Sequence, residues 1–171
     1  MARVQRIAIV VPDSADLRWR VAYARIEATA HDVLAQRPDI RFVERTALGA
    51  VLEEHALQVS GQVADESAIR VGRLSGADGL LLVRIDGPSI HDLLLTHHVE
   101  TLPPVVLTAK LLLTESGEVA WQRAVSVSLQ DAAGWSLGES LKITSLRQAV
   151  DQAIERFKAE LDALVVLPIP S

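Results

Sequence analysis

Asp13 and Asp16 are the first residues in this chain whose side chains could bind a metal ion or a phosphate. They follow the apolar stretch of residues 6–11. If that stretch is a strand of an open α/β sheet, its carboxyl end lies at the edge where such sheets often bind ligands. Aspartates at this position also cap helices, and no matching Lys, Thr or second acidic cluster follows them at an obvious later position. The sequence therefore favours helix capping over ligand binding here.

A run of histidines and carboxylates forms the second candidate group. His91, His97 and His98 lie beside Asp92 and Glu100, and imidazoles with carboxylates are common metal ligands. However, the 91-to-97 spacing is not that of a helical pair, and the adjacent His97 and His98 point apart in most backbone conformations. The three histidines remain metal candidates, but their spacing favours a solvated loop.

A glycine-rich stretch, residues 72–79, has the composition of a phosphate-binding loop but the wrong position. Its glycines close a predicted helix and open a predicted strand, whereas a phosphate loop follows a strand and opens a helix. The pattern instead predicts a helix end at Gly76. No Gly-x-Ser-x-Gly motif is present, and no set of residues meets the geometric requirements for catalysis. We therefore expect a protein without enzymatic activity or a cofactor.

Glu44 and Arg45 stand where a predicted strand ends and a predicted helix begins. A catalytic role would need a second acid or a nucleophile beside them, and the sequence names none. A local ion pair at this corner, worth about 0–1 kcal/mol if exposed, is the simpler interpretation.

Composition narrows the classes of protein that the chain can represent. Its 171 residues suit a single domain over 1–171, with a core over about 5–165 and a short proline-containing tail, 166–171. Hydrophobic residues make up 49% and aromatic residues 4%, so the core must be aliphatic. A net charge of -5 without a basic patch disfavours nucleic acid as a partner, and we expect none. The absence of cysteine excludes disulfides and zinc thiolates, and no apolar run reaches the ~18 residues of a membrane span.

Hydrophobic patterns along the chain predict an α/β (α+β) fold with one mixed sheet of about five strands flanked by helices, in the order β-α-β-α-α-β-β-β-α. The predicted strands are residues 6–11, 40–43, 79–85, 105–113 and 118–129. The predicted helices run from residue 14 to about 37, from Thr46, from Asp65 to the stop at Gly76, and from Ser145, which forms a capping box with Gln148. Residues 86–104 and 131–134 are predicted to be loops.

The ordered set of these motifs resembles the curli assembly and secretion protein family (CsgG-like). The stretch FVERTALGAVLEEHALQVSG is followed by SGADGLLLVRI, by the hairpin sequence ESGEVAW and by a terminal amphipathic helix. The residues that carry the resemblance are Glu44, Arg45, Leu48, Leu52, Glu53, Gly61, Gly76, Ala77, Asp78, Gly117, Glu118 and Trp121. The resemblance implies a fold also similar to periplasmic activators of penicillin-binding proteins and to the N-terminal domain of the Tol-system β-propeller protein. It further implies a non-catalytic role in cell-envelope assemblies.

Two insertion points of the family carry membrane-spanning hairpins in the secretion channel, and this chain departs from it at both. Residues 86–104 show no alternation and contain three prolines. Residues 125–143, around the second point at 130–144, alternate over arms of only about five residues. A membrane strand needs about 9–11 residues, so we expect no spanning hairpin. The apolar residues at these points are Leu93, Leu94 and Leu95 in the first and Trp135 in the second. They either pack onto the sheet or contact a protein partner.

Two functions from different classes follow from these observations. The first is a protein-protein interaction or assembly domain that contacts a partner, or a second copy of itself as a homo-oligomer, through the two loops. The alternative is a small-molecule- or metal-binding α/β protein, with hydrolysis as one activity, that uses Asp13, Asp16 and the His91 to His98 loop. By resemblance the compartment is the periplasm or cell envelope if an export signal was removed, and the cytoplasm if the chain is complete.

Overall fold

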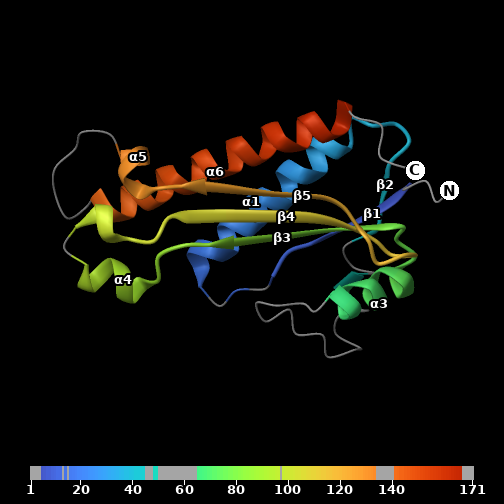
Figure 1. Ribbon diagram of the computed structural model, residues 1–171, viewed down its shortest axis with the longest axis horizontal. Coiled ribbons are helices and arrows are strands. Elements are labelled where there is room, and N and C mark those ends of the chain that lie inside the picture. The colour runs from blue at the N-terminus through green and yellow to red at the C-terminus, as the bar shows by residue number, and fades with distance from the viewer. Residues whose placement is uncertain are drawn as a thin grey trace.

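The computed structural model describes residues 5–12, 14, 16–44, 48–49, 65–96, 98–133 and 141–166. Figure 1 shows the arrangement of the helices and strands along the chain. In chain order they are β1 (Arg6–Val10), α1 (Leu17–Leu34), β2 (Arg41–Phe42), α3 (Asp65–Ser75), β3 (Gly79–Asp86), α4 (Ile90–Leu95), the 3-10 turn η1 (Val99–Thr101), β4 (Val105–Leu113), β5 (Val119–Val127), α5 (Leu129–Ala133) and α6 (Leu141–Val166).

The described strands form one sheet of five in the order β2-β1-β3-β4-β5. β1 lies parallel to both β2 and β3, whereas β4 is antiparallel to β3 and to β5. The central strand β3 is almost wholly apolar, as expected for a strand that is buried on both faces. The predicted single mixed sheet with flanking helices is therefore confirmed.

Helices α1 and α6 pack together on one face of the sheet and enclose the larger core (Figure 1). Ile26 on α1 and Phe157 and Leu161 on α6 are fully buried against Leu81 and Leu107 of the sheet. The i, i+4 spacing of Phe157 and Leu161 places both on the same face of α6, as the sequence pattern predicts.

Helix α3 covers one end of the opposite face and encloses a smaller core. Ala68 and Val71 on α3 pack over Leu80 of β3 and Leu112 of β4. The small side chains on α3 allow this close approach.

Tyr23 joins α1 to the far end of β3. Its hydroxyl donates to the carbonyl oxygen of Ile85 and accepts from the Ile85 N–H, each at 3.1 Å. β1 reaches only as far as the pairing of Val10 with Leu82, so among the described residues no strand extends alongside Ile85 on that side. The tyrosine thus supplies the two hydrogen bonds that a longer β1 would have made.

The two predicted loops contain short helices. Residues 86–104 include α4 and η1, and the predicted loop after β5 includes α5, which begins at Leu129. Leu129 is buried in a helix rather than at the end of a strand, and the Ser128 hydroxyl accepts the Asp131 N–H at 3.0 Å in this first turn. These helices are too short to show a helical hydrophobic period, so the patterns along the chain missed them.

Three predicted helix boundaries are also corrected. Helix α1 begins at Leu17, after its N-cap Asp16, and not at residue 14. Helix α1 ends at Leu34 and not near residue 37, because the chain continues as a tighter turn in which the N–H of Arg37 donates to the Leu34 carbonyl at 3.1 Å. Helix α6 begins at Leu141 and not at Ser145, which lies inside the helix and is buried. Packing of the first turn of α6 beside α4 and α5 outweighs the local capping signal.

Within the described residues, none of the helices has both the length and the apolar composition that crossing a bilayer requires.

Candidate protein-contact site

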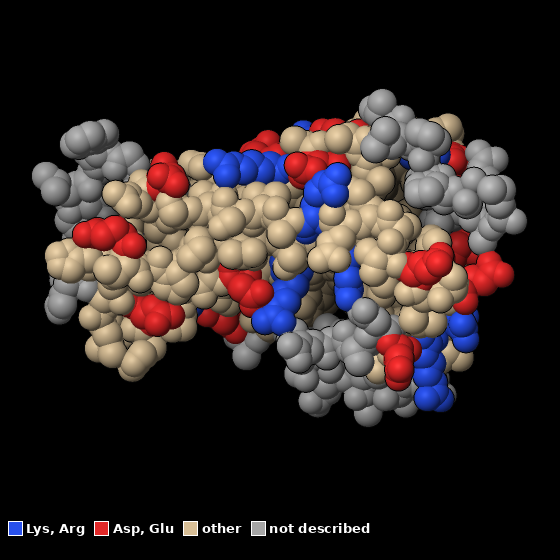
Figure 2. Space-filling view, viewed as in Figure 1, with Lys and Arg blue, Asp and Glu red and all other residues tan. Residues whose placement is uncertain are grey.

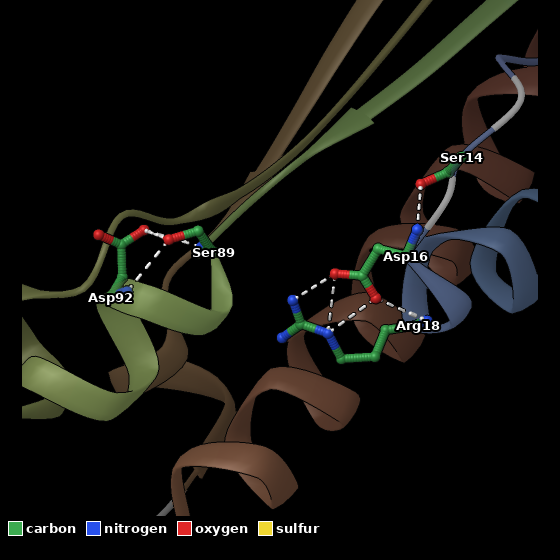
Figure 3. Close-up of polar contacts among 5 residues, drawn as sticks. All are labelled: Ser14, Asp16, Arg18, Ser89 and Asp92. Atoms are coloured by element: carbon green, nitrogen blue, oxygen red, sulfur yellow. Dashed lines mark hydrogen bonds and ion pairs between the residues drawn. The ribbon is translucent and has the colours of Figure 1, made fainter.

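Helix α4 begins at a capping box formed by Ser89 and Asp92 (Figure 3). The Asp92 N–H donates to the Ser89 hydroxyl oxygen at 3.1 Å, and the Asp92 carboxylate accepts from the Ser89 N–H at 2.7 Å. The same carboxylate accepts the Ser89 O–H at 2.7 Å, and these hydrogen bonds lower the pKa of Asp92 below its usual value. A six-residue helix would not persist without such support, so the box holds α4 in place.

Three large apolar side chains of α4 face solvent. Leu94 is 73% exposed, Leu95 63% and Ile90 56%, and α4 contributes no buried side chain to either core. We call Ile90, Leu94 and Leu95 the α4 ledge. Leu93, the other predicted contact residue on this helix, is half-buried and packs against the larger core. The structure thus separates the predicted leucine run into one anchor and two exposed residues.

The start of α6 lies beside the α4 ledge, at the end of the molecule where α4 and α5 also lie (Figure 1). Lys142 Nζ donates to the carbonyl oxygen of Leu93 at 3.2 Å. The next residue, Ile143, is 69% exposed. On the side seen in Figure 2, the surface over α4 is mainly uncharged, with isolated acidic side chains. Trp135, the fourth predicted contact residue, lies outside the described residues.

Sequence reasoning missed Ile90 and Lys142 at this site. Ile90 was missed because residues 86–104 were predicted to be a loop, although Ser89 and Asp92 have the spacing of a capping box. That spacing is the signal that could have found the helix. Lys142 carries no such signal, since its partner is a backbone carbonyl 49 residues away in sequence.

Asp16 acts as the N-cap of α1 and is occupied by its own helix (Figure 3). Its Oδ1 accepts the Arg18 N–H at 2.9 Å, and its Oδ2 lies 2.6 Å from the Arg18 guanidinium. These hydrogen bonds from Arg18 lower the pKa of the Asp16 carboxyl. The prediction that capping explains this aspartate is confirmed for Asp16, whereas Asp13 lies outside the described residues.

Two of the three candidate histidines, His91 and His98, are described by the structure. His91 is exposed on α4, and the exposed His98 has its Nδ1 3.4 Å from the Glu100 carboxylate. His97 is not among the described residues. In the part of the chain that the structure describes, no three His, Asp or Glu side chains are grouped as metal ligands would be.

The corner that joins α3 to β3 explains the Gly-Ala-Asp motif. Gly76 has φ of +69°, and the Ala77 N–H donates to the Gly72 carbonyl at 2.9 Å, as the predicted glycine helix end requires. The Asp78 carboxylate accepts the N–H groups of Gln5 and Arg6 at 3.1 and 3.0 Å. This aspartate therefore fixes the start of β1 beside the start of β3, and its role is structural.

Thr114, at the end of β4, completes the same corner. Its buried hydroxyl donates to the Ala77 carbonyl oxygen at 2.6 Å. Its methyl group packs so closely on α3 that a Cβ on Gly72 would collide with it. Gly72 is therefore needed for close packing of α3 on the sheet. Gly117 has φ of +76° in the turn between β4 and β5, where glycine adopts this conformation readily.

Glu44 is exposed at the end of β2, and its carbonyl oxygen accepts the Leu48 N–H at 3.0 Å. It lines, with Glu27 and His31 of α1, a hollow of about 470 Å³ whose other walls are apolar. The His31 ring stacks on Phe42 with the ring centres 4.2 Å apart. Arg45, Leu52, Glu53 and Gly61 lie outside the described residues, so the predicted Glu44–Arg45 pair stays a prediction.

Several solved structures are similar to this chain at low sequence identity. The LpoB C-terminal domain from Salmonella enterica has 16% identity and a TM-score of 0.47, with 74% of this chain and 85% of that one covered. Lipoprotein GNA1162 from Neisseria meningitidis has 16% identity and a TM-score of 0.45, with 86% and 95% covered. The PelC dodecamer from Paraburkholderia phytofirmans has 16% identity and a TM-score of 0.42, with 95% and 90% covered. All three TM-scores are below 0.5, so no inference about function rests on them.

One family model matches part of the sequence. It is described as the curli production assembly/transport component CsgG and matches residues 30–87, about a third of the chain. No curated protein matches. The matched span runs from α1 to β3 and contains Glu44, Leu48 and the Gly-Ala-Asp corner, whereas Gly117, Glu118 and Trp121 lie beyond it. The predicted resemblance to the curli assembly and secretion family is therefore confirmed, over residues 30–87.

Proposed function

We propose that this chain is a non-catalytic protein-protein interaction or assembly domain of the curli-secretion type, and that the α4 ledge is its contact surface. The partner is a protein with a complementary apolar surface, and a second copy of this chain is the first partner to test. We propose neither a nucleic acid nor a cofactor as a ligand of this chain.

The observation that carries the proposal is the contrast between the order of α4 and its exposure. A capping box and the Lys142 hydrogen bond fix the helix, yet Ile90, Leu94 and Leu95 each leave more than half of their surface exposed. Apolar side chains clustered on one element contribute to stability only when another surface covers them. Protein interfaces use fixed apolar side chains of this kind as their buried centre.

The family match supports the class of function. The matched model describes a curli production assembly/transport component. We propose the cell envelope as the setting in which this chain acts. The matched residues end at residue 87, two residues before Ser89, the N-cap of α4. The match therefore includes the strand from which the chain enters α4. Trp135, in the second predicted loop, remains part of the proposal as a second contact.

The test is the mass of the chain in solution over a wide concentration range, measured by light scattering after size exclusion. Leu94→Asp places a charge at the centre of the ledge, and we expect it to lower association by at least about tenfold, as loss of a buried interface leucine does. Leu74→Asp is the matched control, because Leu74 is 52% exposed on α3, away from α4. Circular dichroism checks that both variants fold.

Equal association of the wild type and Leu94→Asp would remove the ledge from the proposal. A wild type that stays monomeric at all concentrations would exclude self-assembly, and a photo-crosslinking residue at position 94 would then test contact with another protein. A crosslink formed equally from position 74 would count against a specific site.

A further inference from the structure

Ser145 has a buried hydroxyl with no hydrogen-bond partner among the described residues. Its exposed fraction is 0%, and its Oγ neither donates to nor accepts from another described group. The residue lies in the second turn of α6, next to the buried Leu146. Leaving a buried hydroxyl unpaired costs free energy, so the helix that includes residues 141–144 is destabilised at this residue.

The local sequence contains a different start for the same helix. Ser145 and Gln148 have the spacing of a capping box, in which the serine hydroxyl accepts the N–H of the residue three positions on. In that arrangement the Ser145 hydroxyl gains a hydrogen-bond partner. The preceding Ile143 and Thr144 are β-branched, which weakens the first turn of the longer helix.

One hydrogen bond in particular ties the longer helix to the candidate contact site. Lys142, in the first turn of α6, donates to the carbonyl oxygen of Leu93 on α4. Ile143 in the same turn is exposed and adds little burial. The bond to α4 therefore stabilises the helical conformation of residues 141–144, whereas the unpaired Ser145 hydroxyl destabilises it.

We propose that α6 has two forms, one in which residues 141–144 are helical and one that begins at Ser145, and that the change between them regulates the α4 ledge. In the shorter form the Ser145 hydroxyl caps the helix at the Gln148 N–H, residues 141–144 leave the helix, and Lys142 releases Leu93. The link from this change to partner binding rests on the proposed function, but the change in the helix does not.

Amide hydrogen exchange of Leu146 and Arg147 in the isolated chain measures the helix start. In the longer helix these N–H groups donate to carbonyls four residues earlier, in the first turn, and in the shorter helix they have no such partner. Ser145→Ala removes both the orphan hydroxyl and the alternative cap, and we expect exchange at least about tenfold slower. Lys142→Ala removes the bond to α4, and we expect exchange about threefold to tenfold faster.

Ser75→Ala is the matched control, because the Ser75 hydroxyl already donates to the Gly72 carbonyl at 3.0 Å. It should leave exchange at Leu146 and Arg147 unchanged. Unchanged or faster exchange in Ser145→Ala would overturn the two-start proposal, and unchanged exchange in Lys142→Ala would overturn the link to α4.

These outcomes are independent of the Leu94→Asp test of association. If exchange responds as expected and association does not respond to Leu94→Asp, the helix change stands and the proposed function fails. The reverse result removes the helix change and keeps the contact surface.

Discussion

Replacing Tyr23 with phenylalanine removes the two hydrogen bonds that connect α1 to the end of β3. The hydroxyl serves both the N–H and the carbonyl of Ile85, which no described strand pairs on that side. An unpaired buried backbone group costs about 1–3 kcal/mol, and the substitution leaves the ring in place, so it creates no cavity. Allowing for partial relaxation, we expect the free energy of unfolding to fall by about 2–4 kcal/mol.

Urea unfolding followed by circular dichroism measures this loss, and the melting temperature should fall by about 4–16 °C for a chain of this size. Thr101→Val is the control, since it deletes an exposed hydroxyl that donates to the His98 carbonyl at 2.8 Å. It should cost less than about 0.5 kcal/mol. If Tyr23→Phe lowers the free energy of unfolding by no more than this control does, water or another group pairs with the Ile85 backbone. The Tyr23 hydroxyl then does not contribute the stability that we assign to it.

Alkaline pH gives the same prediction an independent check. Burial raises the pKa of the Tyr23 hydroxyl above its usual value of 10.0. The folded protein therefore holds this proton more tightly than the unfolded chain does. Stability should fall as the pH rises above about 10, and the fall should be smaller in Tyr23→Phe.

Three further predictions concern the corner between α3 and β3 and the start of α1. Gly72→Ala should lower the free energy of unfolding by about 1–2 kcal/mol, because the added Cβ meets the Thr114 methyl group. Adding Thr114→Ser, which removes that methyl group but keeps the hydroxyl, should recover most of this loss in a urea double-mutant cycle. If the effects of the two substitutions are fully additive, the two residues are not in contact. Asp78→Ala should lower the free energy of unfolding by about 1 kcal/mol, because it leaves the N–H groups at the start of β1 without their acceptor. These N–H groups should then exchange faster with solvent. Unchanged exchange would show that water replaces the carboxylate. Arg18 lowers the pKa of Asp16 below 3.8, so the wild type should lose stability as the pH falls below about 4. Asp16→Asn keeps the cap and should lose less stability over the same range. If the wild type and Asp16→Asn lose equal stability to urea unfolding between about pH 5 and 2.5, this prediction is wrong.

Strands were the most predictable part of the fold. β4 matches its predicted bounds at residues 105–113, and β3 extends the predicted 79–85 by one residue. Both are long apolar runs that are bounded by glycine, proline or a polar turn, so the local signal and the burial agree. The glycine helix end at Gly76 was equally predictable, because a left-handed residue favours glycine whatever surrounds it.

The candidate site was only partly predictable. The sequence drew attention to the leucines at 93–95 as an apolar group in a polar stretch, but it could not tell which of them is buried. That depends on the direction in which α4 leaves β3 and on the position of α6 beside it. The capping role of Asp16 follows from a contact two residues away, and was therefore readable in advance.

By itself, the amino-acid sequence determined an aliphatic core, the alternation of strands and helices, and the turns that glycine imposes, since each depends on neighbours within a few residues. Tertiary structure decided the exposure of Leu94 and Leu95, the bond from Lys142 to α4 and the helical conformation of residues 141–144 in spite of the capping-box sequence at Ser145. Those features depend on segments about 50 residues apart in the chain meeting at one end of the sheet. Packing energies between such segments exceed the fractions of a kcal/mol by which local propensities differ.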